Sequence, residues 1–389
     1  MGHPVNTSPA THSRIESLDG FRAIAILAVL GFHYFTRWTP TWYQRSYYPY
    51  GSLLATVPVF RFGYLGVSLF FLVSGFVISM TLVRCASWRE FAVRRFARLF
   101  PPMVLASVVT YFALDALPVH FWEPKACSFI PSLTFIDPSL YRQILGDGCG
   151  FIDGSYWSLW YEVRFYVLAA LIYFVGGASR FLWNSAIVVN ASMVVALLEA
   201  SGLHVPGLGV LDAALFPAFA SWLFSGLAFY FIWKDPRSLL AWFVVAESLP
   251  IGILNDYRAY GSGGWPVIIG IYALFTAFAL HARATNVFGA GWLRRIGEAS
   301  YSLYLLHQYL GVTLIAALAA ALGLRGPVSA VIAIGVAILL TGAAMLSYRR
   351  FEIPMRRLVT RLAMPTGVAV KEAGLFASLE RPRDRNLRQ

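Results

Sequence analysis

The sequence predicts an all-α polytopic membrane protein with about ten transmembrane helices and both termini in the cytoplasm. Of its 389 residues, 58% are hydrophobic and only 13% are charged, whereas soluble domains carry about a quarter charged residues. Apolar stretches long enough to cross a bilayer recur along the chain. Short arginine clusters separate them, as in cytoplasmic loops. Membrane topology therefore accounts for the net charge of +12, and we expect the lipid bilayer rather than a nucleic acid as a partner.

The first predicted span, residues 18–37, carries the ionisable residues Asp19, Arg22 and His33 along its length. Such groups are costly in a membrane helix and usually mark a functional site. Eleven residues separate Arg22 from His33, so both side chains should lie on one helix face, about 16 Å apart along the axis. Asp19 should lie one turn from Arg22, and His33 in the outer half of the membrane. The helix predicts a buried reaction site.

The next two predicted spans flank an arginine-rich loop. Residues 63–83 form an uncharged span whose small residues would allow close contact between helices. Residues 84–98 hold five arginines and a single acid, which indicates a cytoplasmic loop. The third span, 99–114, begins with two adjacent prolines, which suit a helix N-terminus.

The loop at 115–155 is predicted to lie outside the cell. It holds five acids against two basic residues. Cys127 and Cys149 both lie in this loop, and an oxidising periplasm would permit a disulfide between them. The sequence leaves open whether the two cysteines lie at the distance and orientation that a disulfide requires.

The rest of the chain continues the alternation of apolar spans and basic turns. The further predicted spans are 156–175, 182–200, 212–233, 239–255, 265–282, 299–322 and 327–347. With 84–98 inside, every second loop is basic. We expect 1–362 to form one transmembrane domain and the polar residues 363–389 to form a disordered cytoplasmic tail.

His33, Arg95 and Arg98 are the first candidates for chemistry. A neutral imidazole takes up a proton from a hydroxyl near neutral pH, although a histidine in a helix can also serve packing. Arg95 and Arg98, spaced i, i+3, should share a helix face at the cytoplasmic surface, where an arginine fork suits a phosphate. Cytoplasmic arginines are also expected from topology alone.

The segment 156–166 places Ser158 and Glu162 on one helix face, with Trp157 and Trp160 nearby. The carboxylate could pair with an arginine or orient a substrate hydroxyl. The alternative is an aromatic belt at the membrane interface with a structural ion pair.

A second polar stripe, in 299–308, consists of Ser300, Tyr304 and His307 at i, i+4 and i+7. Such a stripe could line a site, or could hold helices together by hydrogen bonds. Two intramembrane histidines are also a possible haem ligand pair, but no other feature indicates an electron carrier.

Six sequence motifs in order resemble the acyltransferase-3 family of integral-membrane acyltransferases, which O-acylate sugars and related acceptors. They are LDGFRAIAILAVLGFH (18–33), GVSLFFLVSGF (66–76), RRFARLFPP (94–102), WSLWYE (157–162), SYSLYLLH (300–307) and FEIP (351–354). The resemblance implies an acyl-CoA-dependent O-acyltransferase of the bacterial cytoplasmic membrane, with acetyl-CoA as the default donor and a carbohydrate or glycan hydroxyl as acceptor. It looks like the stand-alone form, without a fused extracytoplasmic hydrolase-like domain.

The resemblance also implies roles for individual residues. His33 falls on the family's essential first-helix histidine, Arg22 on the arginine that accompanies it, and Arg95 and Arg98 on its R-x-x-R motif. We therefore expect His33, Arg22 and Glu162 to be catalytic, and Arg95 and Arg98 to bind acyl-CoA. Substrate-binding residues are expected to be Asp19, Trp157, Ser158, Ser300, Tyr304 and His307. No metal is expected.

Two other functions remain as alternatives. A transport or flippase-type protein could use the buried charges to line a passage, but it would be expected to show interrupted helices in repeated positions, which the sequence does not clearly show. An enzyme of this kind could also acylate a small natural product rather than a glycan.

Overall fold

The computed structural model describes residues 9–364, apart from 41, 44, 45, 147, 204 and 262. These residues form helices joined by loops and turns, and none of them is in a β-strand, which confirms the all-α prediction. The longer helices are α1 (Pro9–Phe35), α3 (Leu65–Leu82), α4 (Trp88–Ala116), α7 (Trp157–Phe174), α8 (Phe181–Ala200), α10 (Pro217–Lys234), α11 (Leu239–Tyr260), α12 (Trp265–Leu280), α15 (Tyr309–Ala321) and α16 (Ala330–Ser347). The shorter α-helices are α2 (Pro58–Arg61), α5 (Phe129–Thr134), α6 (Pro138–Leu145), α9 (Leu208–Leu215), α13 (Gly291–Glu298), α14 (Ser300–Leu306) and α17 (Ile353–Ala363).

The length and hydropathy of these helices confirm a polytopic membrane protein. Seven described helical segments are long and apolar enough to cross a bilayer, or eight if α14 and α15 together form one span. Each of the ten predicted spans overlaps a helix or a helix pair. The count of ten crossings and the cytoplasmic position of both termini stay predictions. The predicted tail at 363–389 lies outside the described residues from residue 365 onward.

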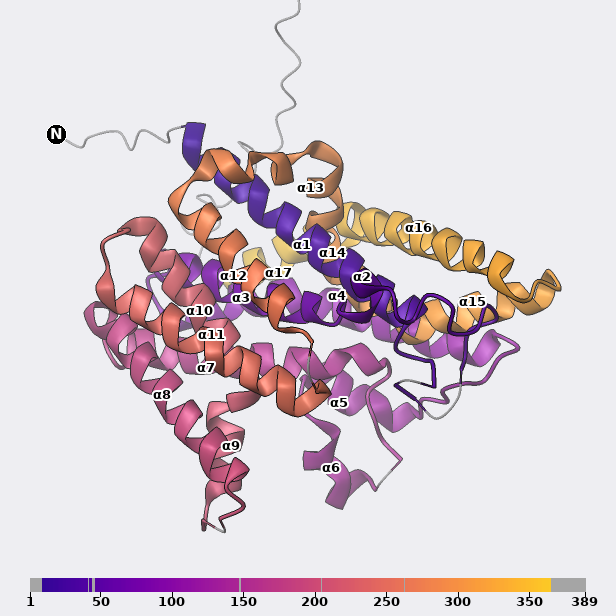
Figure 1. Cartoon of the computed structure of the whole chain (residues 1–389), viewed down its shortest axis with the longest axis horizontal. Coiled ribbons are helices and arrows are strands. Elements are labelled where there is room, and N and C mark those ends of the chain that lie inside the picture. The colour runs from indigo at the N-terminus through magenta and orange to yellow at the C-terminus, as the bar shows by residue number, and fades with distance from the viewer. Residues whose placement is uncertain are drawn as a thin grey trace, which may run out of the picture.

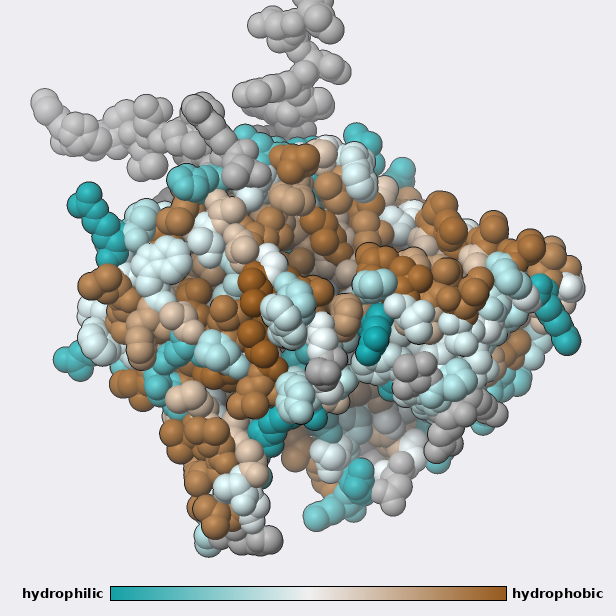
Figure 2. All heavy atoms as spheres, in the orientation of Figure 1, coloured by the Kyte–Doolittle hydropathy of each residue, from teal (hydrophilic) through white to brown (hydrophobic). Residues whose placement is uncertain are grey.

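Helices from distant parts of the chain share one core. Figure 1 shows α8, α10 and α11 at one side of the molecule and α15 and α16 at the other, with α1 and α4 between them. Apolar side chains cover much of the outer surface on both sides (Figure 2). Such a surface suits contact with lipid.

Small residues bring α3 against its neighbours, as predicted. A Cβ atom on Gly75 would lie only 1.9 Å from the carbonyl oxygen of Leu223 in α10, and one on Gly66 only 2.4 Å from that of Ala25 in α1. These backbones approach too closely for any other residue at the two glycines. Close approach of this kind is how membrane helices associate without a hydrophobic driving force.

The predicted start of the third span is wrong. Helix α4 begins at Trp88 rather than at the two prolines, and it continues through Pro101 and Pro102. Capping by side chains explains the early start. The hydroxyl of the N-cap residue Ser87 accepts from the Glu90 amide, and the Glu90 carboxylate accepts from the amide of Ala86, the residue before the cap. Residues 88–98 of the arginine-rich segment are therefore helical, and Arg95 and Arg98 reach the interior of the bundle.

Two other predicted spans are divided in the structure. The segment 212–233 separates into α9 and α10, with α10 starting at Pro217, where the missing N–H costs nothing. The segment 299–322 separates into α14 and α15, which meet at an angle of 61°. The predicted outer loop contains a disulfide between Cys127 and Cys149.

Candidate active site

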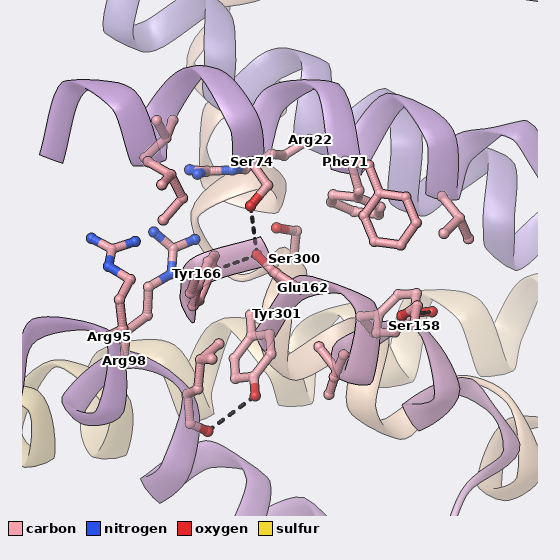
Figure 3. A pocket seen from close by; sticks show the side chains of 17 residues that line it. Arg22, Phe71, Ser74, Arg95, Arg98, Ser158, Glu162, Tyr166, Ser300 and Tyr301 are labelled. Carbon is pink, nitrogen blue, oxygen red and sulfur yellow. Dashed lines mark hydrogen bonds between the residues drawn. The ribbon is translucent and has the colours of Figure 1, made fainter. Parts of the chain in front are cut away.

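A cavity of about 70 Å³ lies among α1, α3, α4, α7 and α14. Seven of the eleven site residues predicted from the sequence line it. They are Arg22, Arg95, Arg98, Ser158, Glu162, Ser300 and Tyr304. Figure 3 shows Arg95 and Arg98 at one end and Ser158 toward the other, with Glu162 between them. Segments far apart in the sequence therefore build one polar site inside an apolar bundle.

Three arginines and one carboxylate line the cavity, so its walls carry a net positive charge. Arg22 forms an ion pair with Asp19 at 2.9 Å. Asp19 itself does not line the cavity, so the structure places it as the partner of Arg22.

Arg95 and Arg98 lie on α4 and point into the cavity (Figure 3). Arg95 Nη2 donates to Thr81 Oγ1 at 3.2 Å, whereas its Nε is buried without a hydrogen-bond partner among the described residues. Arg98 forms no hydrogen bond or ion pair with any residue in the described part of the chain. The two guanidinium groups lie in the interior rather than at the predicted surface position, because α4 starts before them.

Glu162 occupies the middle of the cavity. One carboxylate oxygen, Oε1, accepts from Ser74 Oγ at 2.7 Å and from the Tyr166 hydroxyl. No ion pair joins Glu162 to an arginine among the residues that the structure describes. Trp157, from the same motif, packs against Phe219 with ring centroids 5.3 Å apart and does not line the cavity.

The predicted stripe on α14 reaches from the cavity to a second histidine. The Tyr304 hydroxyl lies 2.7 Å from Ser158 Oγ, so this pair both lines the cavity and links α7 with α14. The Tyr304 ring lies 5.3 Å from the His307 ring. His307 Nε2 in turn lies 3.2 Å from Nδ1 of His33. The sequence marked His33 and His307 separately as candidate site residues, but it did not predict that their rings contact each other.

The hydrogen-bond network assigns the proton on each imidazole ring. His307 Nδ1 lies 2.7 Å from the Tyr304 carbonyl oxygen, and His33 Nδ1 lies 3.0 Å from the Val29 carbonyl oxygen. A carbonyl oxygen only accepts, so both Nδ1 atoms carry a proton. The single Nδ1–H of His33 is then shared between the Val29 carbonyl and His307 Nε2, and His33 Nε2 keeps its lone pair. This is the tautomer that a general base requires.

The fold and the site define a helical membrane protein with a cationic cavity and a nearby histidine pair. His33 and His307 do not line the cavity themselves and are connected to it through Tyr304. Its sequence matches that of the acyltransferase-3 family, described as an acyltransferase domain, over residues 15–346. The chain belongs to this family, and by family it is an acyltransferase.

Curated relatives include O-acetyltransferases from several bacteria. The peptidoglycan O-acetyltransferase OatA of Listeria monocytogenes is 23% identical over 352 residues, which cover 77% of this chain and 50% of the relative. The putative peptidoglycan O-acetyltransferase YrhL of Bacillus subtilis is 25% identical over 338 residues, covering 76% and 48%. The chain thus spans about half the length of these relatives. No solved structure matches it.

Proposed function

We propose that the chain transfers an acyl group, acetyl by default, from acyl-CoA to a hydroxyl of a carbohydrate or glycan acceptor at a bacterial cytoplasmic membrane. The observation that carries the proposal is the cationic cavity with His33 and His307 beyond Tyr304. The family match and the O-acetyltransferase relatives support the same class of reaction.

The arginine end of the cavity suits the phosphates of the acyl donor. Arg98 makes no direct ion pair in the described chain, although the carboxylates of Glu162, Glu352 and Asp19 attract it from a longer distance. Arg95 keeps an Nε without a hydrogen-bond partner there. An unpaired charged group away from bulk water is costly unless an anion joins it. Guanidinium groups bind phosphate through strong, bidentate hydrogen bonds.

His33 is proposed as the general base. Its Nε2 takes the proton of the acceptor hydroxyl as the oxygen attacks the thioester carbonyl. The C–S bond then breaks, and the leaving thiolate of CoA takes that proton from His33, which returns to its neutral form. The charge that forms on the His33 ring is stabilised by His307 Nε2, which accepts from His33 Nδ1–H at 3.2 Å. A transient acyl-histidine remains the second route.

Arg22 and Glu162 are proposed to act on the bound donor. Arg22 lies about 16 Å from His33 along α1 and is paired with Asp19, so donor binding suits it better than direct contact with the base. Glu162, held by Ser74 and Tyr166, is proposed to orient the substrate between the two ends of the cavity.

One feature favours the carrier alternative. The break between α14 and α15 is the kind of interruption found in transporters. Transporters repeat such breaks in both halves of the chain. Within the described residues, α14 and α15 are the one pair of apolar helices that forms a sharply bent span, so no repeat of the break is present there.

The deciding experiment measures free CoA released from acetyl-CoA by detergent-purified protein, with and without a short glycan acceptor. We expect His33→Ala and Arg98→Ala to lose most of the release while their thermal melts stay unchanged. Matched controls are His120→Ala and Arg89→Ala, which replace exposed residues outside the cavity. Equal release by wild type and His33→Ala would remove His33 from the mechanism. Substrate movement across vesicles without CoA release would favour a carrier.

A further inference from the structure

The break beside His307 leaves a helix end that needs a partner. α14 ends at Leu306 and α15 begins at Tyr309, at an angle of 61°. The first amide groups of a helix have no partner within the helix. Here the Tyr309 amide donates to Asp153 Oδ2 at 2.7 Å. Asp153 comes from the outer loop before η2 (Gly154–Tyr156) and is 0% exposed.

The segment that carries Asp153 also contacts the other side of the break. The Tyr304 hydroxyl donates to the Ser155 carbonyl at 3.0 Å. Ser155 Oγ lies 3.1 Å from the Tyr304 carbonyl and 2.7 Å from Asp153 Oδ1, and its single proton is shared between these two acceptors. The Tyr156 hydroxyl donates to the Leu305 carbonyl at 3.3 Å. One short segment therefore holds the end of α14 and the start of α15, so it determines the angle between them.

Asp153 is itself fixed within this segment. Its Oδ1 accepts from the Ser155 amide at 2.8 Å and from Ser155 Oγ at 2.7 Å. Burial raises the pKa of the Asp153 carboxyl to about 6, so the group is ionised at neutral pH. An ionised acceptor makes stronger hydrogen bonds than a neutral one, and a carboxylate at a helix N-terminus is favoured by the helix dipole.

We propose that Asp153 is a positioning residue for the reaction: by capping α15 at the break, it holds His307 Nε2 against His33 Nδ1. His307 lies between the two helix ends that the 153–156 segment joins, and its ring is 4.8 Å from that of His33. A change in the angle of the break moves His307 away from His33. His33 Nδ1–H then loses His307 Nε2 as an acceptor and keeps only the Val29 carbonyl. The inference rests on the proposed function for its catalytic consequence, but not for the structural contact.

The test compares Asp153→Asn with Asp137→Asn. The amide at 153 offers one acceptor oxygen and turns an N–H group toward donors, so it cannot satisfy Tyr309 and Ser155 together. Asp137 is the matched control, because its Oδ1 caps α6 in the same loop through the Ser139 amide at 2.9 Å, far along the chain from the break. If Asp153→Asn does not fold, Ser155→Ala replaces it.

Hydrogen exchange of full-length protein in detergent tests the contact without any activity. We expect the peptide that contains Tyr309 to exchange about tenfold faster in Asp153→Asn, as befits the loss of a hydrogen bond to a charged group, and to be unchanged in Asp137→Asn. Unchanged exchange in Asp153→Asn would overturn the inference. If wild type releases no CoA, the proposed function fails, and the exchange result still decides whether Asp153 holds the break.

A double-mutant cycle tests the consequence for His307. We expect Asp153→Asn to lower kcat for CoA release about tenfold with KM for acetyl-CoA unchanged, and to have less than about a twofold effect when His307 is already alanine. If Asp153 had only a structural role, Asp153→Asn would lower kcat by the same factor in wild type and in His307→Ala. That result would overturn the inference.

Discussion

At the residue scale, the two nitrogens of His33 are set apart by their surroundings. Nδ1 faces the Val29 carbonyl and His307 Nε2, which leaves Nε2 as the basic atom. A helical wheel shows that His33 and Arg22 share a face of α1, but it gives no information about which residue of another helix meets that face. The contact with His307 required the tertiary structure, although the polar stripe on 299–308 marked the residue itself.

The first prediction concerns His307. Replacement by alanine removes the acceptor for His33 Nδ1–H, so we expect kcat for CoA release to fall about tenfold to a hundredfold, the usual worth of a hydrogen bond to a charged group. KM for acetyl-CoA should not change, because the arginines are untouched. His307→Gln should recover part of the loss, since its amide oxygen can accept. Steady-state kinetics of wild type, His307→Ala and His307→Gln test this prediction. A rise in KM for acetyl-CoA with kcat unchanged would contradict the proposed role of His307.

At the element scale, helix boundaries explain both the successes and the errors of the sequence prediction. The capping residues Ser87 and Glu90 start α4 before the arginines, and this moves Arg98 from the expected surface into a cavity. The break at 307–308 depends on Asp153, a residue distant in sequence. Apolar spans were predictable from hydropathy, whereas these ends depend on single hydrogen bonds.

The second prediction concerns the contact between α3 and α10. A methyl group on Gly75 would meet the Leu223 carbonyl at 1.9 Å, so Gly75→Ala should push the helices apart and lower the free energy of unfolding by about 1–3 kcal/mol. Gly342→Ala on α16 is the control, because nothing lies within 4 Å of its added Cβ. Thermal melts in detergent measure both. Equal melting temperatures for Gly75→Ala and wild type would contradict the close packing.

At the scale of the whole molecule, the predicted topology places the acidic loop and the arginine-rich end of α4 on opposite sides of the membrane. The disulfide between Cys127 and Cys149 fits the predicted oxidising side. The segment around Arg89 is predicted to face the cytoplasm. If the prediction holds, the arginine end of the cavity faces the cytoplasm, where the proposed donor is found, and the histidine pair lies nearer the outer side.

The third prediction tests this orientation with a membrane-impermeant maleimide. Leu140→Cys on α6, which is 61% exposed in the wild type, should react in intact cells, and Arg89→Cys only after the membrane is opened. Native Cys85 adds little labelling, because it is 7% exposed and burial raises the pKa of its thiol to about 11. The reverse labelling pattern would show that the chain has the opposite orientation in the membrane, and that the proposed reaction runs in the opposite direction.

Composition, hydropathy and motifs predicted the helical membrane fold, the family and a set of polar residues, most of which line one cavity. These are properties of single segments. Four contacts became known from the folded chain alone: Asp19 pairs with Arg22, Trp157 packs away from the cavity, His307 meets His33, and Asp153 caps α15. Such contacts join residues of different segments, and helix periodicity specifies angles within one helix but not the neighbours, tilts and breaks that bring two helices together.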